Sequence, residues 1–446
     1  MSDETHGRGT TRGEFLRRTG MAAGAAAAGV PLWAKPAGAY PRLSQAPIKI
    51  GFWAPLTGGL SIGGLEAKKG FDLYLEKING RIMNRPVQVI YEDDAGNPAR
   101  SLQVVRKLTE QDKVSIVTGG LNAASGPPVF DYCNEVGMPW INGPIVTDDL
   151  TQRLAHRNTY HIRVGKSGSQ GSHYLAEWVR RTRPNLKNVV VAGADFLLGY
   201  ETCGGFQDVF QRMGGAVIQK IWVPLNTADH APFVGRIDRD ADAILVAMDS
   251  LNSIRFLTAL AQFGLKSQMQ VFTGYVTGDE TVLGAAGLSA EAVLGNISES
   301  TYCGVLNNPV NYDFQRRYND KYRGVSVGGS TAVDMWGALQ FIEAAIKRRK
   351  GDVSNRRKLA QSFIGLKLVT PRGSLTIGQD RNAITDTYIR RVDRASGQLP
   401  PGYTLPYKNT ILRTYKDASQ YWKFEKEGYL KRPPYTRDFP PVKPKK

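Results

Sequence analysis

The chain has 446 residues, a formal net charge of +18 at pH 7, and 41% hydrophobic residues. This length suits two or three domains with a large buried core. The basic residues are spread thinly, with no arginine-rich helix and no basic motif interleaved with aromatic residues, so a solvated basic surface is favoured over a nucleic-acid partner.

Residues 1–39 have the order of an export signal. Arginines precede an apolar run over 21–33, and small residues at 37–39 suit cleavage. The run is shorter than the roughly 20 residues that span a bilayer. Because the pair Arg17-Arg18 follows Phe15-Leu16 instead of preceding it, the route stays open between twin-arginine and general secretion. No cysteine directly follows the run as a site for lipid attachment, so we expect a freely soluble periplasmic protein.

From residue 48 on, short apolar strands alternate with amphipathic helices. Strand 48–53, a glycine-rich loop over 57–64, helix 65–79 and strand 87–91 form a first βαβ unit. Further helices are predicted over 101–111, 129–136, 171–181, 203–213, 253–263, 312–321, 333–348 and 355–364, and strands over 115–117, 139–142, 160–164, 188–192, 216–223, 242–247, 269–273, 372–380 and 387–392. The series predicts an α/β fold of two similar lobes, each a doubly wound parallel sheet.

The sequence lacks the signatures of catalysis and of metal binding. The glycines over 57–64 are not in G-x-G-x-x-G register, no G-x-S-x-G elbow occurs, and neither H-E-x-x-H nor C-x-x-C is present. We therefore predict no enzyme activity, no cofactor and no metal. Cys133, Cys203 and Cys303 allow either one disulfide with one thiol left over, or three buried small apolar residues.

Loops that follow the predicted strands carry the candidates for ligand contact, because open α/β sheets bind ligands beyond the carboxyl ends of their strands. The candidates are Asn122, Ala123, Ser125, Pro144, Thr147, Phe196, Leu198, Asp249 and Tyr275. In the loop over 119–128, polar side chains and amides at a helix start can hold a carboxylate.

Four of the polar candidates have a structural alternative. Ser125 and Thr147 are also suited to cap the helices that follow them, and for Thr147 capping is the favoured alternative. Asp249 is either a partner for a ligand ammonium or a helix cap. Tyr275 is either an aromatic wall of a cleft or a packed surface ring.

The segments IKIGFWAPLTGG, FDLYLEKING, VIYEDDAGNP, GGLNAASGPP and ADFLLGYETCGGF occur in an order that resembles one known family. This family consists of the extracytoplasmic solute-binding proteins of branched-chain amino acid ABC transporters, of the leucine/isoleucine/valine type. The resemblance covers roughly residues 48–392. It implies a type I periplasmic binding protein, in which two Rossmann-like lobes are joined by three crossover strands. The implied parts are an N-terminal lobe of 47–164 plus 298–384 and a C-terminal lobe of 165–297 plus 385–430. The basic, proline-rich composition of 431–446 predicts an irregular tail.

The resemblance also implies a function. The protein would bind a small amino acid or related carboxylate between its lobes and deliver it to a permease, with membrane contact only through that permease. The family's carboxylate grip matches 122–125 and the next loop matches 143–147. Tyr275 stands where leucine-binding members have the acid that pairs with the α-ammonium, so that pairing is either moved to Asp249 or lost. Aromatic acids, amides or urea as ligands, or a ligand-sensing module for a membrane receptor, are the alternatives.

Overall fold

The computed structural model describes residues 46–285, 287–322 and 328–446. The predicted export signal over 1–39 lies outside the described residues. Within the described ranges, no helix combines the length and the apolar character needed to cross a bilayer.

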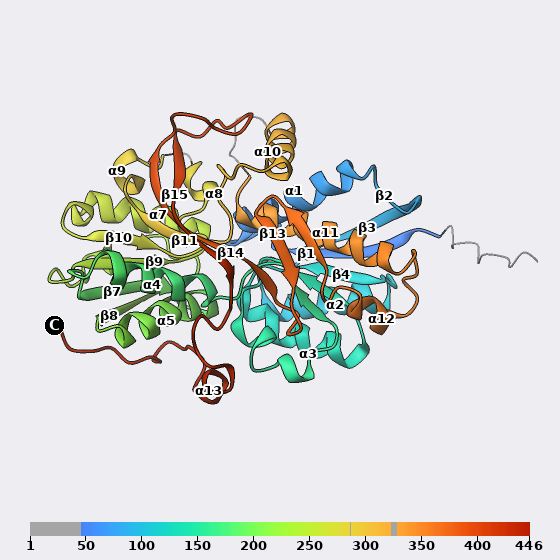
Figure 1. Ribbon diagram of the computed structural model, residues 1–446, viewed down its shortest axis with the longest axis horizontal. Coiled ribbons are helices and arrows are strands. Elements are labelled where there is room, and N and C mark those ends of the chain that lie inside the picture. The colour runs from blue at the N-terminus through green and yellow to red at the C-terminus, as the bar shows by residue number, and fades with distance from the viewer. Residues whose placement is uncertain (1–45, 286, 323–327) are drawn as a thin grey trace, which may run out of the picture. The chain divides into compact units, whose positions relative to one another are not determined.

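The first lobe begins with a six-stranded sheet (Figure 1). Its elements are β1 (Ile48–Ala54), α1 (Ser61–Lys77), β2 (Arg81–Ile82), β3 (Arg85–Asp93), α2 (Pro98–Glu110), β4 (Ile116–Gly119), the 3-10 turn η1 (Ala123–Ser125), α3 (Gly126–Val136), β5 (Trp140–Asn142) and β6 (His161–Arg163). The strand order is β2-β3-β1-β4-β5-β6, and every pair except the β2–β3 hairpin is parallel. Strand β1 is apolar and almost wholly buried, as a strand covered by helices on both faces must be.

The second lobe repeats this winding. Its elements are α4 (Gln170–Thr182), β7 (Asn188–Ala194), α5 (Leu197–Arg212), β8 (Ala216–Val223), α6 (Ala231–Val234), β9 (Ala243–Ala247), α7 (Ser250–Gln262), β10 (Gln270–Thr273), α8 (Glu280–Leu283), α9 (Ala290–Val293) and β11 (Ile297–Ser300). The order β8-β7-β9-β10-β11 matches β3-β1-β4-β5-β6 of the first sheet. Both lobes therefore present a switch point, where ligands of such sheets bind, beside their first strand.

The elements after β11 pack against both lobes. Its elements are α10 (Pro309–Lys321), α11 (Ser330–Arg348), α12 (Arg356–Gln361), β12 (Lys367–Thr370), β13 (Gly373–Ile377), β14 (Ala383–Arg394), β15 (Tyr407–Ala418) and α13 (Lys426–Lys431). One core joins Phe52 and Phe71 to Trp336 of α11. A second joins Val191 to Ile389 of β14. The predicted fold class is confirmed; the residue ranges of the lobes stay a prediction.

Most helices begin earlier than predicted, and the shift is largest for α1 and α5. Helix α1 starts at Ser61 instead of residue 65, because its glycines fit within a helix packed tightly on the preceding loop: a Cβ atom on Gly64 would lie 1.9 Å from the carbonyl oxygen of Pro55. Helix α5 starts at Leu197 instead of residue 203. Its N-cap, Phe196, makes no side-chain capping bond, so the sequence carries no start signal there. All three cysteines are buried and free.

The C-terminal region contains β15, which pairs antiparallel with β14 and was not predicted, and a tail fastened to the second lobe. Residues 432–446 contain no helix or strand, as predicted, yet they are packed. The Arg432 guanidinium lies 4.0 Å from the ring centroid of Tyr429 and pairs with Asp208 of α5. Farther along, Lys443 donates its backbone N–H to Val217 of β8. Figure 1 shows the tail passing below α5 toward β8.

Candidate functional site

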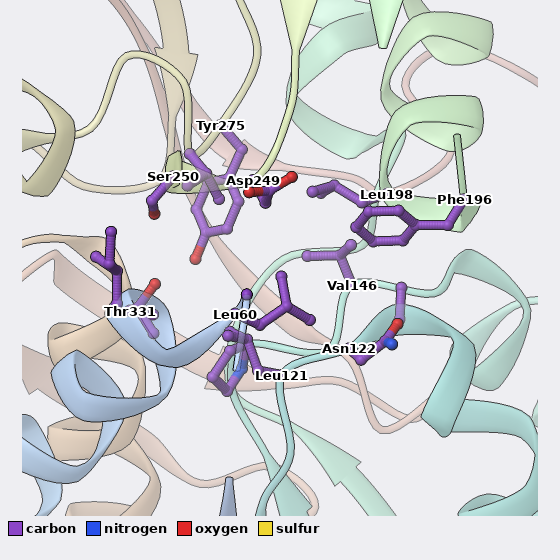
Figure 2. Close-up of a pocket in the computed structure, with 16 residues that line it drawn as sticks. Leu60, Leu121, Asn122, Val146, Phe196, Leu198, Asp249, Ser250, Tyr275 and Thr331 are labelled. Carbon is purple, nitrogen blue, oxygen red and sulfur yellow. The ribbon is translucent and has the colours of Figure 1, made fainter. Parts of the chain in front are cut away.

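A pocket lies where the strands of both sheets end (Figure 2). It encloses about 550 Å³ of space free of atoms, its open mouth included. The lining residues follow β1, β4 and β5 in the first lobe and β7, β9 and β10 in the second, with one more from the start of α11. They are Gly59, Leu60, Ile62, Gly63, Leu121, Asn122, Ala123, Pro144, Val146, Phe196, Leu198, Asp249, Ser250, Tyr275, Val276 and Thr331.

The two lobes touch around this pocket. Ala123 and Val146 of the first lobe pack in one apolar cluster with Phe196 and Tyr275 of the second. A Cβ atom on Gly59 would lie 1.7 Å from Oδ1 of Asn226 in the loop after β8, so any other residue at position 59 would require the Asn226 side chain to move. The structure is therefore a closed arrangement of the lobes, with the pocket between them.

Four long helices begin at the pocket. Its wall includes first-turn residues of α1 (Ile62), α5 (Leu198), α7 (Ser250) and α11 (Thr331). First-turn amides have no acceptor within their own helix, and the helix dipole makes this end positive. The pocket thus combines a largely apolar surface with the N-terminal ends of four helices, an arrangement that favours a negatively charged group on an otherwise apolar molecule. Two of these ends already hold a carboxylate: Asp249 caps α7, and Asp279 accepts the backbone N–H of Ser330 at the start of α11 at 2.9 Å.

Asp249 is the only lining residue with an ionisable carboxylate among the described residues. It is the N-cap of α7: its Oδ1 accepts the backbone N–H of Asn252 at 3.2 Å, and its Oδ2 accepts the side-chain amide of Asn252 at 3.0 Å. Burial raises the pKa of the Asp249 carboxyl above its usual value. The predicted alternative of a helix cap is confirmed, and the same side chain lies on the pocket wall.

Tyr275 connects the pocket to a group of buried charges. Its hydroxyl donates to Oδ2 of Asp334 at 2.5 Å, and its backbone N–H donates to Oε1 of Glu299 at 3.1 Å. Lys166 pairs with Glu299 and places its ammonium 4.7 Å from the centroid of the Tyr275 ring. Asp334 also pairs with Arg372. We call Lys166, Glu299, Tyr275, Asp334 and Arg372 the hinge network.

Every member of the hinge network is at most 2% exposed. Burial, with Asp334 alongside, raises the pKa of the Tyr275 phenol well above its usual value. Sequence reasoning found only Tyr275. Asp334 offered a signal, because it is an acid in the apolar segment TAVDMWGAL of a predicted helix, and a buried acid needs a partner.

Asn122 lies on the pocket wall, but its polar atoms already have partners. Its amide donates to the carbonyl of Gly96 at 2.7 Å, and its Oδ1 accepts the N–H of Ala124 at 2.9 Å, capping the turn η1. Its side chain therefore fixes the backbone of the loop that forms this part of the pocket wall, together with Ala123.

Ser125 and Thr147 do not line the pocket, in contrast to the predicted ligand contact. The Ser125 hydroxyl is fully buried, 2.8 Å from that of Ser101. The Thr147 hydroxyl donates to the carbonyl of Ala123 at 2.6 Å. Neither side chain makes a capping bond, so the capping alternatives are wrong too. The Ser125 hydroxyl thus has its partner in α2, and the Thr147 hydroxyl has its partner in the backbone of η1.

The other seven candidates all line this pocket: Asn122, Ala123, Pro144, Phe196, Leu198, Asp249 and Tyr275. Whether they contact a ligand stays a prediction. The sequence analysis did not predict Thr331 as a pocket residue. It considered only loops that follow strands, whereas α11 is preceded by helix α10. In the part of the chain that the structure describes, no group of three His, Cys, Asp or Glu side chains could hold a metal ion.

Several known proteins are similar to this chain. The Leu/Ile/Val-binding protein homolog 6 of Brucella suis biovar 1 (strain 1330) is 24% identical over 353 residues, which cover 78% of this chain and 88% of that protein. A solute-binding protein of an ABC transporter from Rhodopseudomonas palustris BisB5, in complex with 3,4-dihydroxybenzoic acid, superposes with a TM-score of 0.76 at 24% identity, covering 84% of this chain and 99% of that one. A solute-binding protein of R. palustris in complex with benzoate gives a TM-score of 0.74 at 20% identity, covering 84% and 97%.

The family model described as "Periplasmic binding protein" matches residues 47–398, and therefore includes all sixteen residues of the pocket wall. The match ends before β15 and the tail. With most of its length matched and with two lobes wound as in the solute-binding proteins of ABC transporters, the chain belongs to the periplasmic binding protein family.

Proposed function

We propose that the protein is the periplasmic solute-binding component of an ABC importer, and that its ligand is a small organic acid with an apolar, preferably aromatic, body. It delivers this ligand to the permease and catalyses no reaction. The observation that carries the proposal is the composition of the pocket wall: apolar side chains, four helix N-termini, and a single carboxylate that already caps a helix.

The carboxylate of the ligand is assigned to the helix N-termini. The hydroxyls of Ser250 and Thr331 are added donors there, since both residues lie in first turns on the wall. Charge-assisted hydrogen bonds of this kind are about twice as strong as neutral ones. In Figure 2 the two side chains and the Tyr275 hydroxyl lie on one side of the pocket.

The apolar body is assigned to the opposite side, where Figure 2 shows Phe196, Leu198 and Val146. An aromatic ring buried there would gain from offset or edge-on contact with Phe196. Two solved structures of similar fold hold benzoate or dihydroxybenzoate, which agrees with this arrangement.

An amino acid is the second candidate, and Asp249 is the observation in its favour. A carboxylate on the wall can pair with a ligand ammonium, and relatives carry the name Leu/Ile/Val-binding. Because both Asp249 oxygens already accept bonds from Asn252, we favour the acid without an ammonium.

A thermal-shift screen against benzoate, 4-hydroxybenzoate, leucine and urea tests the proposal. A ligand at about 100 times its dissociation constant adds roughly 2.7 kcal/mol of stability, so we expect a clear rise in melting temperature with the benzoates. Stabilisation by leucine alone would instead establish the amino-acid alternative. Stabilisation by none of these solutes would contradict the proposal.

The variant pair Phe196→Ala and Phe263→Ala locates the binding site. Phe196 lines the pocket, whereas Phe263 lies on the surface of the same lobe, 39% exposed. We expect Phe196→Ala to weaken benzoate binding by about 1–3 kcal/mol through lost apolar contact, and Phe263→Ala to leave it unchanged. Equal binding by both variants would place the ligand elsewhere.

A further inference from the structure

The hydrogen bond between Tyr275 and Asp334 crosses from one lobe to the other. Tyr275 follows β10 of the second sheet. Asp334 lies in α11, and its neighbours Val333 and Trp336 belong to the core of the first lobe. The bond is 2.5 Å long, and Tyr275 is also a residue of the pocket wall.

The two ends of this bond are held by different parts of the hinge network. On the second lobe, the backbone of Tyr275 is fixed by Glu299 of β11. At the other end, Asp334 is fixed by Arg372, which lies between β12 and β13 and whose Nη1 donates to the hydroxyl of Thr301, the residue after β11, at 3.0 Å. Because both ends are buried and already oriented, little side-chain freedom is lost when the bond forms.

We propose that Asp334 is a positioning residue that acts through Tyr275 as a latch between the lobes, favouring the closed arrangement before any ligand binds. The bond exists only when the lobes are together. Opening separates the Tyr275 phenol from the Asp334 carboxylate. The latch also commits the Tyr275 hydroxyl to Asp334, so the ring forms a fixed wall of the pocket. The inference goes beyond the proposed function, because it concerns the protein without ligand and holds for any solute.

The substitution Tyr275→Phe tests the latch, since it removes only the hydroxyl and leaves the ring and the Asp334–Arg372 pair in place. A matched control exists inside the first lobe: Tyr74 of α1 donates its hydroxyl to Glu343 of α11 at 2.6 Å, and Tyr74 is 5% exposed. Tyr74→Phe therefore removes the same kind of bond without affecting contact between the lobes.

The readout is the distance between spin labels on cysteines introduced at the exposed positions Gln111 in the first lobe and Gln268 in the second. The three native cysteines are buried and do not compete for labelling. In ligand-free protein, we expect Tyr275→Phe to lower the ratio of closed to open molecules by about tenfold or more. A hydrogen bond to a charged group typically shifts an equilibrium by a factor of this size. Tyr74→Phe should keep the wild-type distances while lowering the melting temperature.

Two results would overturn the latch. One is an unchanged distance distribution in Tyr275→Phe. The other is an equal shift in Tyr74→Phe, which would mean that general loosening, and not the bond across the lobes, opens the protein. Neither reading depends on finding the ligand, so a failed solute screen and a failed latch remain distinguishable.

Discussion

The pocket wall and the hinge network directly behind it use opposite chemistry. The wall is apolar and has one carboxylate, Asp249, whereas the network holds two ion pairs, Lys166–Glu299 and Arg372–Asp334, with Tyr275 belonging to both regions. Buried charge is costly unless it is paired and hydrogen-bonded. Under the proposed function and the proposed latch, the buried charges hold the contact between the lobes, whereas backbone amides and apolar side chains contact the ligand.

The largest expected effect comes from unpairing the hinge network. Arg372→Met leaves Asp334 buried without its cation, which should lower the free energy of unfolding by about 3–5 kcal/mol. Arg391→Met is the control, because Arg391 pairs with Asp393 on an exposed part of β14, where an ion pair contributes about 0–1 kcal/mol. Urea denaturation of both variants measures the difference. Equal losses would show that the network contributes no more than a surface pair.

Removing the carboxylate from the wall should have a smaller effect. Asp249→Ala removes the cap of α7, at a cost of about 1 kcal/mol in stability. If the ligand is an acid without an ammonium, its binding should survive this change within a few-fold. If the ligand is an amino acid paired with Asp249, the loss should reach roughly 2–5 kcal/mol. Titration calorimetry of the variant separates the two cases.

The smallest effect is a pH dependence that follows from the raised pKa of Asp249. The proton on this carboxyl is held more tightly in the folded protein, so its stabilising contribution is complete below the unfolded pKa of about 3.9 and is lost as the pH rises through the higher folded value. Over the same window, ionised Asp249 repels a ligand carboxylate, so benzoate affinity should fall with rising pH.

Asp249→Asn provides the reference for this pH dependence. The ratio of the benzoate dissociation constants of the wild type and Asp249→Asn cancels the titration of the ligand itself. We expect this ratio to rise from about pH 4 upward. A ratio that falls would mean that the ionised carboxylate attracts the ligand, as it would attract an ammonium.

The features that could be predicted from the sequence are those that a local pattern of residues determines. Apolar strands alternating with helices predicted both sheets, and the strand-end rule reached Phe196 and Asp249, which line the pocket. The hinge network was beyond such reasoning, because Lys166, Glu299 and Asp334 are far apart in the chain and each is an ordinary charged residue until the fold pairs them. A pairing of this kind is set by the tertiary structure, and no local motif encodes it.

The measurement that tests the central claim most directly is a calorimetric titration of the wild-type protein with leucine and with 4-methylpentanoate, which has the same apolar body and carboxylate but lacks the ammonium. A wall whose single carboxylate already caps α7 should bind 4-methylpentanoate at least as tightly as leucine. Leucine binding that is tighter by a hundredfold or more, equivalent to about 2.7 kcal/mol, would show that the pocket recognises the ammonium and would contradict the account.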